Sequence, residues 1–219
     1  KIPMLEPSDS AECCEFTKLA YELSEKYDTP FIIKMCTRVA HSQSVVDLGE
    51  RIEVPVKTYV KDAGKYVMVP ANAKKRHPVV EERTMRLVEF AESSSLNRVE
   101  EGTDKAMGFI TSSTSYQYVK EVFGDKYPVL KLGLVNPLPV KLIKDFAAKV
   151  DKLVVVEELD PIIENYCRAM GLEVTGKDVF PMIDEFSQGI VATNLGLPEK
   201  PACKPIEGLP GRPPAMCAG

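Results

Sequence analysis

Short apolar runs alternate with amphipathic stretches between residues 105 and 161. The apolar runs are GFIT, YPVLKLGLV and LVVV, and each stretch between them has helical spacing over about ten to fifteen residues. This alternation predicts a βαβαβ arrangement and therefore a parallel sheet. The LVVV run is apolar at every position, as expected of a strand that is covered on both faces.

The second amphipathic stretch shows the helical period most clearly. Its apolar side chains share one face and its charged side chains the opposite face. The apolar set is Leu142, Ile143, Phe146, Ala147 and Val150, and the charged set is Lys141, Lys144, Asp145 and Lys149. The predicted fold class is thus α/β with a parallel sheet, which alone implies no function.

The N-terminal residues predict one helix followed by one strand. Ser8 or Asp9 is suited to cap a helix that carries Glu12 in its first turn and ends near Tyr27. Its apolar stripe is Cys13, Phe16, Ala20 and Leu23. Pro30 introduces FIIKMCTRV, which is typical of a strand. This pair has the pattern of the last unit of an α/β domain whose earlier part is absent.

Several further elements are expected around this core. Residues 42–65 predict a connection with a short extended stretch at 53–60, followed by a helix over 79–91 and an extended segment over 93–101. Pro161 favours the first turn of a helix that ends at Gly171. LEVTGK predicts a short edge strand, and the proline-rich residues from Leu197 onward predict an extended linker.

Composition narrows the class of protein. The 219 residues suit one large domain or two small ones, with 44% hydrophobic and 27% charged residues. A net charge of −4 does not indicate nucleic-acid or anionic-membrane binding. No apolar run is long enough to span a bilayer, and no signal-peptide pattern is present. Six scattered cysteines argue against a disulfide framework and favour a cytoplasmic location.

Because the chain begins with Lys1, we expect a piece of a larger protein.

Nucleotide-binding motifs are weak. No G-x-G occurs, so the Rossmann signature is absent. Gly171–Lys177 matches G-x-x-x-x-G-K, but Asp178 stands where a phosphate loop needs Ser or Thr, and no helix is predicted after it. We therefore do not expect a working phosphate loop.

Two clusters fall at predicted carboxyl ends of parallel strands, where α/β proteins usually bind ligands. Thr111–Ser115 opens a helix, and N-capping by the hydroxyls is the favoured interpretation over ligand binding. Glu157, Glu158 and Asp160 follow LVVV. Close carboxylates can do acid–base chemistry, but a structural role near a helix N-terminus is favoured.

Thr37, Arg38, His41 and Ser42 end the predicted FIIKMCTRV strand. An arginine there could clamp a carboxylate, and a histidine could transfer protons. The simpler interpretation is a salt bridge at a domain junction together with a surface histidine. Lys74–His77 precedes the predicted 79–91 helix and indicates a solvated face or a subunit contact.

Most cysteines are expected to pack as small apolar residues. This applies to Cys13, Cys14, Cys36 and Cys167. Cys217 differs, because it lies in the linker-like segment beside glycine and is a candidate metal ligand. A single cysteine does not define a cluster.

Several strings together resemble one family. They are PSDSAECCEFTKLAYELSEKYDTPFIIKMCTRVAHS, KYVMVPANAKKRH, GFITSSTSYQYVKE, LVNPLPVKLI, VVVEELDPIIE and RPPAMCAG. In this order, the strings resemble the alpha subunits of indolepyruvate ferredoxin oxidoreductases, which belong to the thiamine-diphosphate-dependent 2-oxoacid:ferredoxin oxidoreductases.

The resemblance implies a parent enzyme that oxidatively decarboxylates aryl pyruvates to acyl-CoA and passes electrons through [4Fe-4S] clusters to ferredoxin. It implies thiamine diphosphate and Mg²⁺ as further cofactors, a beta subunit as partner, and an oligomer. Residues 1–44 would end the pyrimidine-binding domain, and 45–64 would be a linker. Residues 65–196 would be a transketolase C-terminal-like domain, and 197–219 would lead into the pyrophosphate-binding domain.

Several parts of the family pattern are missing from this sequence, and their absence bears on what the segment can do alone. The activating glutamate, the pyrophosphate and magnesium motif and the cysteine-rich tail have no counterpart in this sequence. The segment alone is therefore expected to bind no cofactor, to be inactive, and to act mainly as structure and interface. Thr37, Arg38, His41 and Ser42 match the family string T-R-x-[SA]-H-S, with Ala40 before His41, and are candidates for a site-facing edge. The alternatives are a free-standing nucleotide- or flavin-binding module and an acid–base enzyme built on Glu157 and Glu158.

Overall fold

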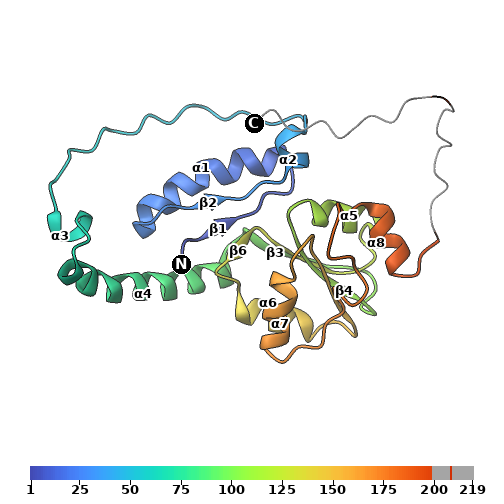
Figure 1. The fold of residues 1–219 in the computed structure, drawn as a ribbon. Coiled ribbons are helices and arrows are strands. Elements are labelled where there is room, and N and C mark those ends of the chain that lie inside the picture. The colour runs from blue at the N-terminus through green and yellow to red at the C-terminus, as the bar shows by residue number, and fades with distance from the viewer. Residues whose placement is uncertain (199–207, 209–219) are drawn as a thin grey trace.

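A four-stranded sheet forms the centre of the protein in a computed structural model, which describes residues 1–198 and 208 (Figure 1). Its strand order is β3-β5-β4-β7. The strands are β3 (Asn97–Glu100), β4 (Gly108–Ser112), β5 (Val129–Leu132) and β7 (Leu153–Val156). β4 pairs in parallel with both β5 and β7, and β3 pairs antiparallel with β5. The predicted βαβαβ arrangement and α/β fold class are confirmed.

Helices cover both faces of this sheet. One face carries α5 (Ser113–Phe123) and α8 (Gln188–Asn194), and the other carries α6 (Val140–Ala147) and α7 (Ile162–Ala169) (Figure 1). The LVVV strand alternates between the two cores, with Leu153 and Val155 in one and Val154 and Val156 in the other. Its continuous apolar run therefore has the predicted cause, burial on both sides.

A smaller sheet lies beside the first, in the order β2-β1-β6. Its strands are β1 (Met4–Leu5), β2 (Ile32–Ile33) and β6 (Leu134–Asn136). The helix α1 (Ser10–Tyr27) joins β1 to the parallel strand β2. Asp9 caps α1 as predicted, since its carboxylate accepts from the Glu12 amide at 2.9 Å.

The run YPVLKLGLV belongs to both sheets rather than to one strand. Its first half is β5, and its second half is β6, which pairs antiparallel with β1. Gly133 separates the two strands, and its amide donates to the backbone oxygen of Leu96 at 2.9 Å. The residue at this change of sheet is glycine because a Cβ there would collide with the Leu96 carbonyl oxygen and the Phe16 ring.

The predicted FIIKMCTRV strand is wrong beyond its first residues. Only Ile32 and Ile33 form β2, and Thr37–His41 form the short helix α2. β1 is only two residues long, so a longer β2 would have no ladder to join. Thr37, Arg38 and His41 therefore lie on a helix, with Ser42 at its end.

The helix α4 (Pro70–Ser93) is longer than the predicted 79–91 helix and follows the short α3 (Ala63–Tyr66). Pro70 occupies its first turn, where proline is tolerated. Lys74–His77 thus lie within a helix and not before it. Their half of α4 is mostly exposed, so it lacks the apolar period that marks the buried half around Leu87 and Ala91.

Other predictions have mixed outcomes. α7 ends as expected before Gly171, which has φ +82°. The predicted edge strand at LEVTGK is reduced to a single bridge between Val154 and Thr175. Residues 42–62 form neither helix nor strand. The predicted linker from Leu197 lies almost wholly outside the described residues. Within residues 1–198 and 208, no helix combines the length and the apolarity needed to cross a membrane.

Replacing Gly133 with alanine is expected to destabilise the protein by about 2 kcal/mol, because overpacking forces backbone shifts. The added Cβ would lie 2.6 Å from the Leu96 carbonyl oxygen and 2.9 Å from the Phe16 ring. Gly189→Ala in α8 is the matched control, since its Cβ would lie no closer than 3.6 Å to a neighbour. Urea unfolding of both variants measures the difference; equal stabilities would contradict the steric argument.

Candidate functional site at the carboxyl edge of the parallel sheet

The N-terminal residues lie on the carboxyl edge of the parallel sheet. The Ser112 hydroxyl, at the end of β4, donates to Glu6 Oε2 at 2.6 Å. Gln117 in α5 donates to Asp9 Oδ2 at 3.1 Å. The edge at which such sheets usually bind ligands is thus occupied by the chain's own carboxylates.

Lys131 is the centre of this contact. It lies in β5, and its side chain is 0% exposed. Its ammonium donates to the Ser8 hydroxyl at 2.9 Å and to the Glu12 carboxylate of α1, and lies 4.8 Å from the centre of the Tyr116 ring. Burial lowers the pKa of Lys131, and its contact with Glu12 only partly opposes this.

The carboxylate of Glu12 is held by three residues. Ser8 donates its backbone amide at 2.8 Å, Arg98 its guanidinium at 3.0 Å, and Lys131 its ammonium. Burial alone would raise the pKa of Glu12, but these donors lower it below its usual value. The carboxylate is therefore ionised at neutral pH.

The network continues outward from Arg98. Arg98 Nε donates to Glu100 at 3.0 Å, and the Tyr116 hydroxyl donates to the same carboxylate at 2.7 Å. Lys120 lies 3.1 Å from Glu100. Burial would raise the pKa of Glu100, but these donors lower it. A chain of paired charges thus runs from the buried Lys131 to the surface.

A second contact joins the end of the N-terminal unit to the same edge. Arg38 in α2 donates to the Glu158 carboxylate and, at 3.2 Å, to the Phe186 carbonyl. Its guanidinium lies 5.4 Å from the centre of the Tyr118 ring. The structure therefore brings together two groups that the sequence analysis treated separately, Arg38 and Glu158.

The other residues of the T-R-x-[SA]-H-S string lie differently. Thr37 and His41 are exposed on α2. The Ser42 hydroxyl donates to the Val39 carbonyl at 2.8 Å and lies 2.7 Å from the Ser10 hydroxyl. Arg38 thus forms the salt bridge that the simpler interpretation expected. The candidate metal ligand Cys217 lies outside the described residues.

The hydroxyls at Thr111–Ser115 do not cap α5 as expected. Ser112 occupies the N-cap position but makes no side-chain cap bond, because its hydroxyl is bonded to Glu6. Thr111 donates to the Val156 carbonyl at 2.8 Å and so links neighbouring strands. Ser113 has φ +51°, which is uncommon for a residue with a side chain and makes the strand-to-helix turn sharp.

Glu157 has the structural role that was favoured. Its two carboxylate oxygens accept from the amides of Ile163 and Glu164 at the start of α7, each at 2.9 Å. Burial raises the pKa of Glu157, while these amides oppose the rise. Glu158 is bonded instead to Arg38 and to the Phe186 amide at 2.6 Å. The two carboxylates therefore serve separate contacts and form no acid–base pair.

The loop that resembles a phosphate loop binds an internal carboxylate. The Lys177 amide donates to Glu164 Oε2 at 2.8 Å. The Lys177 ammonium donates to the carbonyls of Glu157 and Pro181, at 2.6 and 3.1 Å. The amide and the ammonium of Lys177 are thus both bonded to acceptors within the chain.

The described cysteines are free thiols. Cys167 is buried as expected, and burial raises its pKa to about 12. Cys13, Cys14 and Cys36 are only partly buried, and Cys36 lies 3.7 Å from the Thr114 hydroxyl. In the ranges 1–198 and 208, no three His, Cys, Asp or Glu side chains group as a metal site would require.

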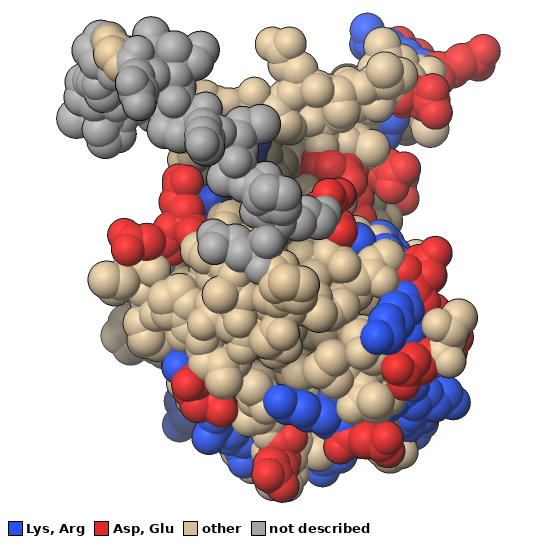
Figure 2. All heavy atoms as spheres, turned by 90° about the vertical axis from the view of Figure 1, so that its right-hand side faces the viewer, with Lys and Arg blue, Asp and Glu red and all other residues tan. Residues whose placement is uncertain are grey.

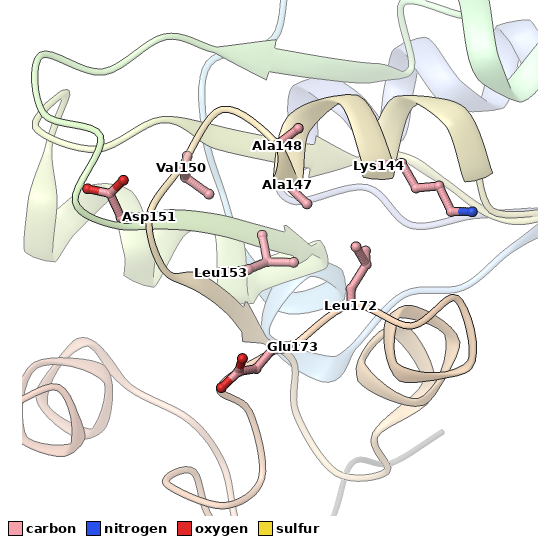
Figure 3. Close-up of a pocket in the computed structure, with 8 residues that line it drawn as sticks. All are labelled: Lys144, Ala147, Ala148, Val150, Asp151, Leu153, Leu172 and Glu173. Carbon is pink, nitrogen blue, oxygen red and sulfur yellow. The ribbon is translucent and has the colours of Figure 1, made fainter.

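A shallow pocket of about 250 Å³ lies on the opposite edge of the sheet. Its apolar lining includes Leu153, the first residue of β7, and Leu172 after α7. Figure 3 shows that its three charged side chains, Lys144, Asp151 and Glu173, point in different directions rather than toward one another. On the face drawn in Figure 2, positive and negative side chains are interspersed. Neither this pocket nor this distribution of charges indicates a second candidate site besides the carboxyl edge.

The fold resembles part of one solved structure. The structure resembles a 2-oxoglutarate:ferredoxin oxidoreductase from Magnetococcus marinus with a TM-score of 0.57, over 80% of this chain and 38% of that chain, at 18% identity. This likeness supports the predicted transketolase C-terminal-like fold.

The comparison of sequences gives a more specific likeness than the comparison of structures. The whole chain is 37% identical to the indolepyruvate oxidoreductase subunit IorA of Archaeoglobus fulgidus and 36% identical to that of Methanothermobacter thermautotrophicus. The Pyrococcus horikoshii IorA is 31% identical over 99% of the chain. The chain spans 38% of the length of each of these relatives. No protein-family model matches it. The resemblance seen in the sequence strings is confirmed: this chain is similar along its length to a part of IorA.

Replacing Lys131 with methionine is expected to destabilise the fold by about 3 kcal/mol, because it leaves the buried Glu12 carboxylate short of a partner. Adding Glu12→Gln should recover at least about 1 kcal/mol, since coupled partners are not additive. Urea unfolding of the single and double variants gives the coupling free energy. If the losses of stability in the two single variants simply add up in the double variant, Lys131 and Glu12 are not coupled.

Acid should remove the contribution of Glu12. Its pKa is lowered in the folded protein from the usual 4.5, so its stabilisation is complete above about pH 4.5 and is lost as the pH falls through the folded value. The free energy of unfolding of Glu12→Gln should therefore approach that of the unsubstituted protein as the pH falls from about 7 to about 3. Glu15→Gln, an exposed carboxylate of the same helix, controls for loss of a charge. A gap that stays constant with pH would be inconsistent with this mechanism.

Proposed function

We propose that this chain is the part of an indolepyruvate:ferredoxin oxidoreductase alpha subunit that supports and orients the catalytic parts of the parent enzyme. The observation that carries this proposal is the identity of 31–38% to IorA relatives over 99–100% of the chain.

The parent enzyme would oxidatively decarboxylate an aryl pyruvate to its acyl-CoA and pass electrons to ferredoxin. The names of the relatives support indolepyruvate as the 2-oxoacid. The structural neighbour is described with 2-oxoglutarate, coenzyme A and succinyl-CoA bound, a 2-oxoacid with the corresponding acyl-CoA. A beta subunit and ferredoxin would be the protein partners.

Thiamine diphosphate, Mg²⁺ and [4Fe-4S] clusters would be the cofactors of the parent. The described residues of this chain do not fit them. At the carboxyl edge, Ser112 is bonded to Glu6 and Lys131 to Glu12, while Arg38 Nε is buried without a hydrogen-bond partner. Residues 1–198 also lack a cluster of metal-binding side chains. The cofactors would therefore be held elsewhere in the parent, and no catalytic step is derived from this chain.

The proposed role of this segment is to hold α2 at a fixed place. The N-terminal unit is tied to the sheet at its start by Glu12 and Lys131 and at its end by Arg38 and Glu158. Thr37 and His41 are thereby presented on the surface beside the joint, as a site-facing edge would require. The domain division into 1–44, 45–64, 65–196 and 197–219 stays a proposal, since β6 pairs with β1 and the core around α1 also contains Leu87 and Leu134. The free thiols suit a reducing cytoplasm.

The proposal is tested by expressing the parent reading frame with its beta subunit. Anaerobic assays should show ferredoxin reduction that needs indolepyruvate and CoA, with lower kcat/KM for 2-oxoglutarate and pyruvate. Residues 1–219 alone should show no turnover under the same conditions. A preference for a non-aromatic 2-oxoacid would refute the substrate proposal, and ferredoxin-independent activity would refute the function.

The two histidines of the chain provide a matched test of the site-facing edge. In the parent enzyme, His41→Gln should lower kcat by about tenfold or more if His41 takes part in proton transfer or substrate orientation. His77→Gln should leave kcat unchanged, because His77 lies on α4 paired with Glu81 at 2.8 Å. Equal activity of both variants would remove His41 from the site without affecting the proposed function.

A further inference from the structure

Residues 42–62 carry an exposed apolar segment. They connect α2 to α3 and arch past α1 without forming a helix or strand (Figure 1). Connections of more than about 12–15 residues without secondary structure are uncommon in compact domains and are usually either functional loops or linkers. Large apolar side chains lie open on this one: Val56 is 98% exposed, Ile52 81% and Val60 74%.

The segment has the residue pattern of a β-strand. Every second residue from position 52 to position 60 is β-branched, and the residues between are polar, aromatic or proline. The β-branched set is Ile52, Val54, Val56, Thr58 and Val60, and the other set is Arg51, Glu53, Pro55, Lys57, Tyr59 and Lys61. This alternation is typical of a strand with one buried face. We call residues 51–61 the arm.

The charges of the arm are self-complementary in one antiparallel register. If two copies pair about Pro55, Glu53 of each copy faces Lys57 of the other. Pairing about Val54 or Val56 would instead place Arg51 opposite Lys57 or Lys61. Pairing about Glu53 or Lys57 would place like charges opposite each other, which is destabilising. Pairing about Ile52 joins Arg51 to Glu53 but overlaps only a short part of the arm, and pairing about Lys57 joins Glu53 to Lys61 but also opposes Lys57 to itself. Over most of the arm, only the register about Pro55 joins opposite charges without facing like charges.

The proline fits the same register. Directly opposed residues in an antiparallel pair alternate between hydrogen-bonded and non-hydrogen-bonded positions. Pro55 has no N–H, so it must occupy a non-hydrogen-bonded position with its nitrogen on the outer edge. Val54 then faces Val56 in a hydrogen-bonded pair, and Glu53 faces Lys57 in a close non-hydrogen-bonded pair. The outer edge at Pro55 also blocks a third strand.

A two-stranded ribbon alone is only marginally stable, but the arm has a support beside it. Lys57 forms an ion pair with Glu25 on α1, and Gly49 lies close to the Lys18 side chain. Between these two contact points on α1 lies Tyr21, which is 75% exposed. Because Lys57 belongs to the set that alternates with the β-branched residues, this contact turns the polar face of the arm toward α1 and leaves the β-branched face exposed.

We propose that the arm binds the arm of a second copy of this chain, as an antiparallel two-stranded ribbon whose two-fold axis passes between the two Pro55 residues. This interaction is independent of the catalytic activity proposed above. It assigns a homotypic interface to the connection between α2 and α3, with Glu53 and Lys57 as the pair that determines its register.

Charge exchange tests the pairing. Glu53→Lys and Lys57→Glu should each weaken dimerisation of the 219-residue chain at least tenfold, because each replaces two attractive contacts with two repulsive ones. The double variant E53K/K57E should return to within about threefold of the unsubstituted chain. Glu15→Gln, which removes an exposed carboxylate elsewhere on α1, is the control and should leave dimerisation unchanged. Sedimentation equilibrium measures the dissociation constants of the four variants and of the unsubstituted chain.

Disulfide trapping tests the register. Pro55→Cys should form a disulfide with itself across the two-fold axis on mild oxidation, because directly opposed residues lie within disulfide reach. Thr58→Cys should not, since it would face Ile52. Peptide mass spectrometry distinguishes a 55–55 bridge from bridges of the native cysteines.

The two experiments together distinguish results that support the proposal from results that overturn it. Rescue by the double exchange, together with a 55–55 bridge, supports the proposal. A chain that stays monomeric at high concentration, a dimer that is insensitive to single exchanges, or a dimer that the double exchange fails to restore would overturn it.

Discussion

The ammonium of Lys131 lies where no water reaches it, inside a strand whose neighbours Leu130 and Leu132 belong to the apolar core. A buried charge without a partner costs several kcal/mol, so the fold must supply a carboxylate at that point. Glu12 supplies it from the first turn of α1. The position of α1 over the sheet is thereby determined, since a shifted helix would leave two buried charges unpaired. A buried ion pair adds little net stability, but in this role it specifies one arrangement of the two sheets.

Because of this constraint, the carboxyl edge of the parallel sheet has a structural role. In most doubly wound proteins that edge is open to a ligand. Here Glu6, Ser8 and Glu12 occupy it, and hydroxyls that would otherwise attract a ligand or cap a helix are bonded to the chain itself. Arg38 and Glu158 close the other end of the joint. The edge therefore works as a joint between two sheets, which agrees with a supporting role in a larger enzyme and disfavours a free-standing nucleotide or flavin module.

The sequence predicted those elements that bury one face against the parallel sheet. The periods of α6 and of the LVVV strand are clear because their apolar residues enter two definite cores. The prediction from the sequence failed where tertiary contacts decide the local structure. Gly133 divides one apolar run between two sheets, and the exposed half of α4 has no apolar period. The site was predicted only in part. Arg38 and Glu158 were both noted, but their pairing was not. Lys131 was missed, although a lone lysine within the apolar run VLKLGL is a signal for a buried ion pair.

The geometry of α1 explains why a long connection follows α2. Ser42 contacts Ser10 at the start of α1, while Lys65 of α3 contacts Asp28 at its end, at 2.6 Å. The chain must therefore return along the whole helix, and 18 residues of helix span about 27 Å. Residues 42–62 could reach about 70 Å when extended. The surplus length lets residues 51–61 bow away from α1, so the same joint that places α2 also leaves a strand-patterned segment free to meet another chain.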